Sequence, residues 1–133
     1  MDTVVFYGKV FAAVLLSVAS EFLGAYDGLL HALVVFAVID YITGILQAIS
    51  DRQLSSEIGA HGIVKKVAMF ALVGIANMID LHIVGSEHLV RSATLWFYLS
   101  NEGISIIENI TALGVPVPEK LKEVLQQIKG KVK

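Results

Sequence analysis

The sequence has no cysteine and only two prolines among its 133 residues. Without cysteine the chain forms no disulfide and offers no thiolate ligand to a metal. Both prolines lie close together near the C-terminus, at Pro116 and Pro118. Because proline cannot continue a helix, this pair ends the last long apolar segment and separates it from the tail that follows.

Charge is also scarce, since 17% of the residues are charged and 56% are hydrophobic, with a mean hydropathy of +0.74. A soluble domain averages about 45–50% apolar and about 25% charged residues. The apolar excess indicates that lipid is the solvent. The formal net charge of −2 and the pI near 6.0 do not favour a nucleic-acid partner.

Motifs for catalysis or metal binding are missing as well. The four histidines have no metal-ligand spacing, and the pair Glu57 and His61, four residues apart, falls in a segment rich in glycine. The sequence contains no glycine-rich phosphate loop, no Ser/His/Asp arrangement and no zinc motif. We therefore expect a protein that is not an enzyme and that needs no metal or cofactor.

Four apolar segments have the length of about 20 residues that crosses a bilayer as a helix. They cover about residues 4–24, 29–49, 63–84 and 89–112, and together predict a transmembrane domain over residues 1–114. Asp27-Gly28 predicts a tight link between the first two segments, and residues 50–62 predict a polar loop. Residues 10–19 resemble the core of a signal peptide, but no basic cluster precedes them and apolar residues resume at once. A retained first span is favoured.

Residues 115–133 predict a basic amphipathic tail. Five lysines and two glutamates follow the prolines, and an apolar face runs along one side of the predicted helix. That face comprises Leu121, Val124, Leu125, Ile128 and Val132. Two interpretations are open: a solvated cytosolic tail, or a helix lying on anionic lipid headgroups.

Lysine and arginine in short loops predict the orientation, because they stay on the cytosolic side. Arg52, Lys65 and Lys66 lie in or next to the loop between the second and third segments, and the tail is basic, whereas the two other links lack basic residues. This distribution predicts a multi-pass protein of the cytoplasmic membrane with four spans, both termini cytosolic, and Lys65 and Lys66 as basic anchors. Three spans are the alternative, because the fourth segment is polar.

The fourth segment carries a continuous polar stripe, since residues three and four apart share a helix face. The stripe comprises Arg91, Thr94, Tyr98, Asn101, Glu102, Ser105, Glu108 and Asn109. A carboxylate that faces lipid at mid-membrane costs about 2.5–3.5 kcal/mol on insertion scales, so the stripe must face protein or water. It either forms hydrogen bonds between helices within one bundle, or lines an aqueous lesion in an oligomer, and these two roles are compatible in time. A helix lying on the membrane surface is the third interpretation.

Polar residues also interrupt the second and third segments. Asp40, Thr43 and Gly44 share one helix face in the second segment, and Asn77 and Asp80 share a face in the third. We expect these residues to mark helix packing and polar contacts inside the membrane. Asp80 is expected to pair with Arg91, because both lie near the outer edge.

Several of these motifs occur in an order that resembles the phage lysis and toxin-secretion holins, a family of small membrane proteins (phage holin family 4, clostridial toxin-secretion type). The motifs are DYITG from Asp40, LSSEIGAHGIVKK around Gly59 and Gly62, and Asp80. The most specific is the pattern N-E-x-x-S-x-x-E-N from Asn101, followed by G-x-P-x-P. The resemblance covers about residues 33–128.

The resemblance implies a protein that oligomerises in the bacterial host membrane and opens a lesion. Endolysin or a toxin then passes through the lesion to the cell wall as a passenger rather than as a bound partner, which gives timed host lysis. On this carry-over the residues expected in the pore or at the oligomer interface are Asn101, Glu102, Ser105, Glu108, Asn109, Arg91 and Tyr98. The alternatives are an antiholin, which would be a partner of a holin, and a small ion transporter.

Overall fold

The computed structural model describes residues 2–85 and 87–132, and all regular structure within these ranges is helical. The elements are α1 (Asp2–Leu23), α2 (Gly28–Ser50), α3 (Ser56–Ile79), a π-helical turn (Asp80–Val84), α4 (Leu89–Ala112) and α5 (Glu119–Val132). The all-α prediction is confirmed. Three helical segments are long and apolar enough to cross a membrane, namely Asp2–Leu23, Gly28–Ser50 and Ser56–Val84. The more polar α4 has the length but not the hydropathy, so the expected fourth span stays a prediction.

Short polar side chains set where the helices begin. The Asp27 carboxylate accepts a hydrogen bond from the Leu30 backbone N–H (2.9 Å) at the start of α2. The Ser55 hydroxyl accepts one from Ile58 N–H (3.2 Å) at the start of α3. Each side chain satisfies one of the backbone donors that have no partner inside the first turn.

The sequence interpretation of residues 56–62 as loop is wrong, because α3 already begins at Ser56. Gly59 and Gly62 do not interrupt the helix but allow the Tyr41 ring to approach it. A Cβ on Gly62 would lie 3.2 Å from a Tyr41 ring carbon, and the Tyr41 hydroxyl donates to the Gly59 carbonyl (3.3 Å). The two glycines therefore serve the packing of α2 on α3.

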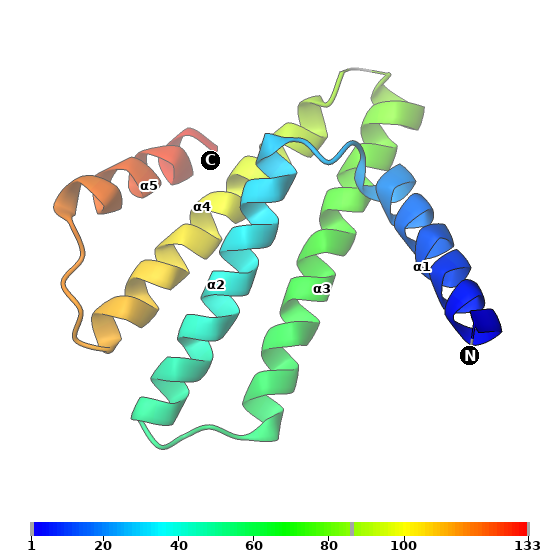
Figure 1. The fold of residues 1–133 in the computed structure, drawn as a ribbon. Helices are drawn as coiled ribbons and strands as arrows, with labels where there is room; N and C mark the ends of the chain where they lie inside the picture. Colours follow the sequence, from blue (N-terminus) through cyan, green and yellow to red (C-terminus); the bar gives the residue numbers. More distant parts are fainter. Residues whose placement is uncertain (1, 86, 133) are drawn as a thin grey trace.

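The central helix of the bundle is α4, which lies against α2 and α3 on one side and against α5 on the other (Figure 1). Buried apolar side chains of α2, α3 and α4 form the core: Leu30, Leu33, Ala37, Met69, Val73, Leu95 and Leu99. The links α1–α2 and α3–α4 lie at one end of the bundle, and α2–α3 and α4–α5 lie at the other. Consecutive helices from α2 to α4 therefore run antiparallel.

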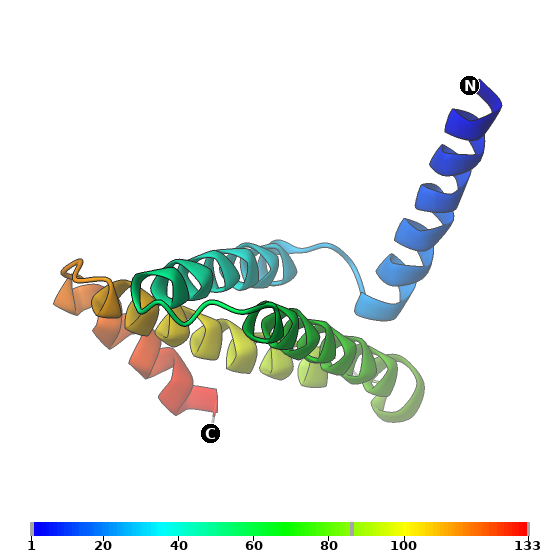
Figure 2. The same ribbon diagram turned by 90° about the horizontal axis from the view of Figure 1, so that it is seen from below.

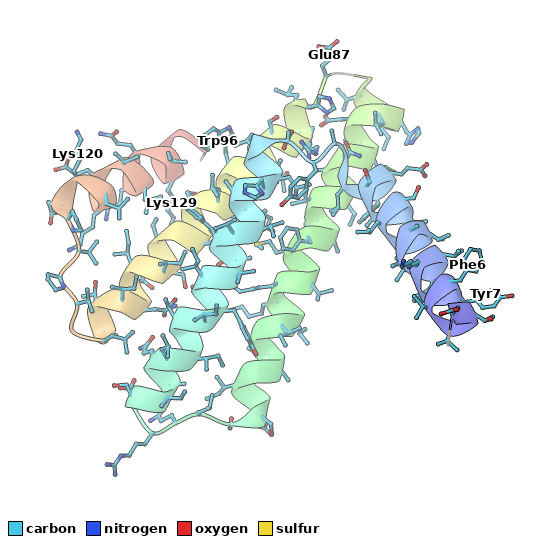
Figure 3. The ribbon with its side chains drawn as sticks, viewed as in Figure 1. Phe6, Tyr7, Glu87, Trp96, Lys120 and Lys129 are labelled. Atoms are coloured by element: carbon cyan, nitrogen blue, oxygen red, sulfur yellow. The ribbon has the colours of Figure 1, made fainter. Side chains whose placement is uncertain are left out.

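The first helix stands away from the bundle, as Figure 2 shows, and none of its residues is buried. Its apolar side chains, including Phe6 and Tyr7, point into the surroundings (Figure 3). Only its C-terminal end is attached. The Phe22 ring occupies the space in which a Cβ on Gly74 would lie, and Asn77 Nδ2 donates to the carbonyls of Glu21 (3.3 Å) and Phe22 (3.0 Å). An exposed apolar helix of this kind is suited to contact with lipid.

The C-terminal helix α5 packs along α4 after the turn that contains both prolines. Leu125 is its buried residue within the described side chains, and it lies against Gly103 of α4, which Phe36 of α2 also approaches. The tail is thus an amphipathic helix that packs on α4 through Leu125, while Leu121 and Val124 of its apolar side stay exposed. Neither interpretation of the sequence, a solvated tail or a helix on headgroups, included this contact.

Candidate functional site

A layer of charged side chains joins the three core helices. The Lys66 ammonium of α3 lies 2.6 Å from Asp40 Oδ2 of α2 and 3.0 Å from Glu102 Oε1 of α4. All three side chains are largely buried, with exposed fractions of 19%, 13% and 10% for Lys66, Asp40 and Glu102. One cation thus bridges two carboxylates, and the three formal charges sum to −1. Lys66 was interpreted as a basic anchor together with Lys65. In the structure Lys66 is instead the inner cation of the bundle, and Lys65 alone is exposed.

Asn109 extends this layer along α4 towards the end that carries the α4–α5 turn. Its Nδ2 donates to Asp40 Oδ1 (3.1 Å) and to Thr43 Oγ1 (3.0 Å). The Thr43 hydroxyl in turn donates to the Ile39 carbonyl (2.9 Å). Both oxygens of Asp40 therefore have a donor, one from Lys66 and one from Asn109. Such pairing is what allows polar groups to persist in a low-dielectric environment.

A cavity of about 350 Å³ opens beside the ion pairs, between α3 and α4. Its polar lining includes Tyr98, Asn101 and Ser105 of α4, together with the three charged residues of the layer. Water that enters this cavity reaches Lys66 and Glu102 without any helix having to separate. The layer is therefore buried in the bundle but adjacent to a space that can be hydrated.

A second polar junction, centred on Arg91, lies at the opposite end of α4. Its guanidinium donates to the carbonyls of Leu23 (2.7 Å) and Ala25 (2.8 Å) and forms an ion pair with Asp27 (2.7 Å). Arg91 is only 1% exposed. Gly24 has a φ of +89°, and a Cβ there would lie 2.7 Å from Arg91 Nε, so glycine meets both the conformational and the steric demand. This junction fixes the end of α1 to the start of α4.

The side chain of Asp80 caps α4 rather than pairing with the Arg91 guanidinium. Its two carboxylate oxygens accept from the backbone N–H groups of Val90 (2.9 Å) and Arg91 (2.8 Å). The expected contact between Asp80 and Arg91 thus exists through the backbone, and the ionic partner of the guanidinium is Asp27. Sequence reasoning treated Asp27 only as a turn residue. The sequence did contain a signal for the ion pair. Asp27 lies in the link between the first two segments, and this link and Arg91 are predicted at the same edge of the membrane.

Comparison with known proteins assigns the chain to a family. A model of the bacteriophage holin family matches residues 17–130. The chain belongs to this family. A probable holin of Bacillus phage phi105 is 34% identical over 115 residues, which cover 86% of this chain and 84% of that protein.

Two further relatives have no described role. An uncharacterised protein of Listeria monocytogenes is 47% identical over 102 residues, covering 77% of this chain and 72% of its own length. An uncharacterised 14.9 kDa protein of Clostridium perfringens is 43% identical over 108 residues, covering 81% of this chain and 82% of its own length. No solved structure matches the chain. Together with three apolar helices, the family match makes this a membrane protein of the holin family.

The residues that the sequence assigned to a holin pore or interface separate into four places in the structure. Glu102 and Asn109 belong to the charged layer, and Tyr98, Asn101 and Ser105 line the cavity beside it. Glu108 is exposed on α4, and Arg91 lies in the junction with α1. Of the residues expected in helix packing, Asp40 and Thr43 belong to the layer, with Gly44 beside Asn109; Asn77 holds the end of α1, and Asp80 caps α4.

Acid titration is expected to weaken the junction between Asp27 and Arg91. Burial acts to raise the pKa of Asp27, but the hydrogen bonds from Arg91 and from the Leu30 N–H outweigh it and lower the pKa below the usual 3.8. A lowered pKa in the folded chain stabilises the fold above pH 3.8, and this contribution is lost as the pH falls through the folded value.

Asp27→Asn tests this dependence, because asparagine still caps α2 but carries no charge. We expect the parent chain to melt at a higher temperature than the variant near neutral pH, and the difference to close below about pH 4. Thermal unfolding of both proteins in lipid nanodiscs across this range measures it. A difference that stays constant with pH would contradict the assignment of the effect to the Asp27 carboxylate.

Proposed function

We propose that the chain is a holin, which oligomerises in the cytoplasmic membrane of a bacterial host and opens a lesion through which endolysin or a toxin reaches the cell wall. The observation that carries this proposal is the family match over residues 17–130, supported by the similarity to a probable phage holin. Membership in a holin family also agrees with the prediction of a membrane protein that is not an enzyme. The charged layer and the cavity beside it support a physical account of the closed state that precedes the lesion.

In the resting chain, polar groups of α4 find their partners inside one molecule. Lys66 joins Glu102 to Asp40, and Asn109 bridges to α2. Because α4 packs against the apolar helices α2 and α3, parallel to α2 and antiparallel to α3, its position favours a fourth crossing of the membrane, with both termini on the cytosolic side. Intramolecular pairing removes most of the cost of placing Glu102 of α4, Asp40 of α2 and Lys66 of α3 in hydrocarbon.

In the assembled state, water can replace the intramolecular partners of the charged layer. The cavity lined by Tyr98, Asn101 and Ser105 provides a route for water to the charged layer. Glu108 is already exposed on α4 in the single chain. When copies gather, hydration of this side of α4 offsets the loss of pairing, so an oligomer with a water-filled interior becomes accessible to a chain that inserts as a closed bundle.

Co-expression with an endolysin tests the function directly. A holin kills the host abruptly and releases the enzyme, which an abrupt drop in culture turbidity and endolysin activity outside the cytoplasm report. An antiholin instead delays killing by a partner holin. A transporter gives a substrate-dependent effect without passage of a folded enzyme, and either of these outcomes would replace the proposal.

The double variant Glu102→Leu/Glu108→Leu tests the role of the α4 carboxylates. We expect it to reach the membrane at the parent level, because Lys66 keeps Asp40 as a partner, but to lose lysis. Glu87→Leu, in the exposed link before α4, is the matched control and should lyse normally. Immunoblots of membrane fractions and lysis curves measure the two properties. Unchanged lysis timing in the double variant would remove these carboxylates from the mechanism.

A further inference from the structure

The contact between α5 and α4 lies at the middle of α4 rather than at its end. The methyl carbons of Leu125 lie 2.8 and 3.1 Å from the position that a Cβ on Gly103 would occupy, and a Phe36 ring carbon lies 3.2 Å from the same position. Gly103 is near the centre of Leu89–Ala112. We call Gly103 and Phe36 the Leu125 site. Because glycine leaves this space open, the leucine side chain packs directly on the α4 backbone.

The side of α5 that faces away from α4 is polar. The exposed polar residues of α5 are Glu119, Lys120, Glu123, Gln126, Gln127 and Lys129, and Leu121 and Val124 at the edge of its apolar face are 48% and 40% exposed. Lys120 projects outward from the start of the helix (Figure 3). By contrast, the exposed surfaces of α1, α2 and α3 are rich in valine, leucine, isoleucine and phenylalanine. The molecule therefore has one apolar side, formed by α1 to α3, and one polar side, which includes α5.

Glu108 and the half-buried Asn101 of α4 border this polar side, although Trp96 and Phe97 of the same helix are also exposed. At 100° per residue, Asn101 and Glu108 point in nearly the same direction, away from the α5 contact at Gly103 and on the far side of the Glu102 direction. Glu108 is exposed, and Asn101 lines the cavity that also contains Lys65 of α3. Polar groups of α3, α4 and α5 thus border a single side of the bundle.

A charged helix docked at mid-height of a membrane-crossing helix is costly against acyl chains, so its docking favours an assembly in which the outer side of α5 meets water. We propose, on the basis of the holin function above, that the outer side of α5 lines the water-filled interior of the assembled lesion. The Leu125 site holds α5 on α4 in that state, and α1, α2 and α3 face lipid. The partner on the polar side is a second copy of this chain, across water.

This arrangement assigns a charge to the lesion wall. Within residues 119–130, whose side chains the structure describes, α5 carries three lysines and two glutamates. A wall built from α5 is therefore positive, and small anions should pass more readily than small cations. The arrangement differs from a free cytosolic tail, which would leave the middle of α4 uncovered, and from a plug, which would have to leave before the lesion opens.

The absence of native cysteine makes the docking of α5 directly testable. The pair Gly103→Cys/Leu125→Cys should form an intramolecular disulfide when membranes that contain the variant are oxidised, because a Cβ on Gly103 lies within 3 Å of the Leu125 side chain, at 2.8 Å. The control pair Val38→Cys/Leu125→Cys should not, because Val38 is exposed on another side of α2. Cells that express the first pair should lyse and release co-expressed endolysin both when oxidised and when reduced with dithiothreitol, because α5 stays in place in the open lesion.

Solvent access is tested with single cysteines. Gln127→Cys, on the polar side of α5, should react with a membrane-impermeant maleimide once the lesion opens, and Val38→Cys should show no reaction. Failure of the Gly103–Leu125 disulfide in a chain that still lyses would overturn the docking while leaving the holin function intact. Loss of lysis only on oxidation would make α5 a plug and overturn the lining role. Absence of lysis from the parent chain would instead contradict the proposed function.

Discussion

A Lys66→Met chain is expected to lose about 3–5 kcal/mol of folding free energy, because the substitution removes the cation from between two largely buried carboxylates. Asp40 keeps Asn109 as a donor, but Glu102 loses the hydrogen bonds that Lys66 Nζ donates to both of its oxygens, and the two negative charges then repel each other. Methionine has a similar length, so the effect is electrostatic rather than a cavity. Thermal unfolding in lipid nanodiscs and the amount of chain in the membrane fraction both measure it.

Lys65→Met is the matched control, since Lys65 is the exposed neighbour of Lys66 and its loss should change the melting temperature little. Rescue supplies a second check. The triple variant Lys66→Met/Asp40→Asn/Glu102→Gln removes all three charges together and should recover most of the stability, because neutral amides can hydrogen-bond to each other. Equal melting of the parent and Lys66→Met chains would show that the ion pairs contribute no folding energy.

Hydrophobic length and periodicity were sufficient to place most of the helices. The predicted segments 29–49 and 89–112 agree closely with α2 (Gly28–Ser50) and α4 (Leu89–Ala112), and the tail is helical from Glu119 to Val132. The start of α3 was missed because Gly59 and Gly62 read as loop residues by local propensity. Both glycines serve a tertiary contact with Tyr41, which lies eighteen residues before Gly59 in the sequence. Local propensity carries no information about a contact between residues so far apart.

The polar stripe of α4 shows where sequence reasoning about a site stops. Helical spacing placed Glu102 and Asn109 on one face, and the structure brings both into the charged layer. The same spacing could not select their partners. Lys66 is 36 residues from Glu102 and adjacent to an equally basic Lys65, so only the packing of α3 decides which lysine turns inward. Long side chains that reach the membrane edge or the interior look alike in sequence.

The position of α5 along α4 could not be predicted from the sequence for a related reason. Its basic composition suits a soluble tail or a headgroup-bound helix, and both expectations treat the helix in isolation. The structure places the apolar residue Leu125 against Gly103, at the centre of α4. A glycine in mid-helix is a weak local signal, yet here it marks the contact that determines which side of the bundle is polar.

Arg91→Met is expected to cost about 3 kcal/mol, the lower end of the range for removing one partner of a buried ion pair. The guanidinium is 1% exposed and serves three acceptors, the carbonyls of Leu23 and Ala25 and the Asp27 carboxylate. The lower end applies because the Asp27 side chain is 44% exposed and regains water when the arginine is lost. Thermal unfolding in nanodiscs measures the cost.

The geometry of the guanidinium distinguishes this effect from a simple loss of charge. Arg91→Lys keeps the charge, but an ammonium on a flexible stem cannot reproduce the planar set of donors that reaches all three acceptors, so it should recover only part of the stability. Arg52→Met, in the exposed loop before α3, is the control and should melt like the parent. If Arg91→Lys restored the parent melting temperature, the ion pair with Asp27 alone would hold α1 to α4, and the two carbonyl contacts would contribute nothing measurable.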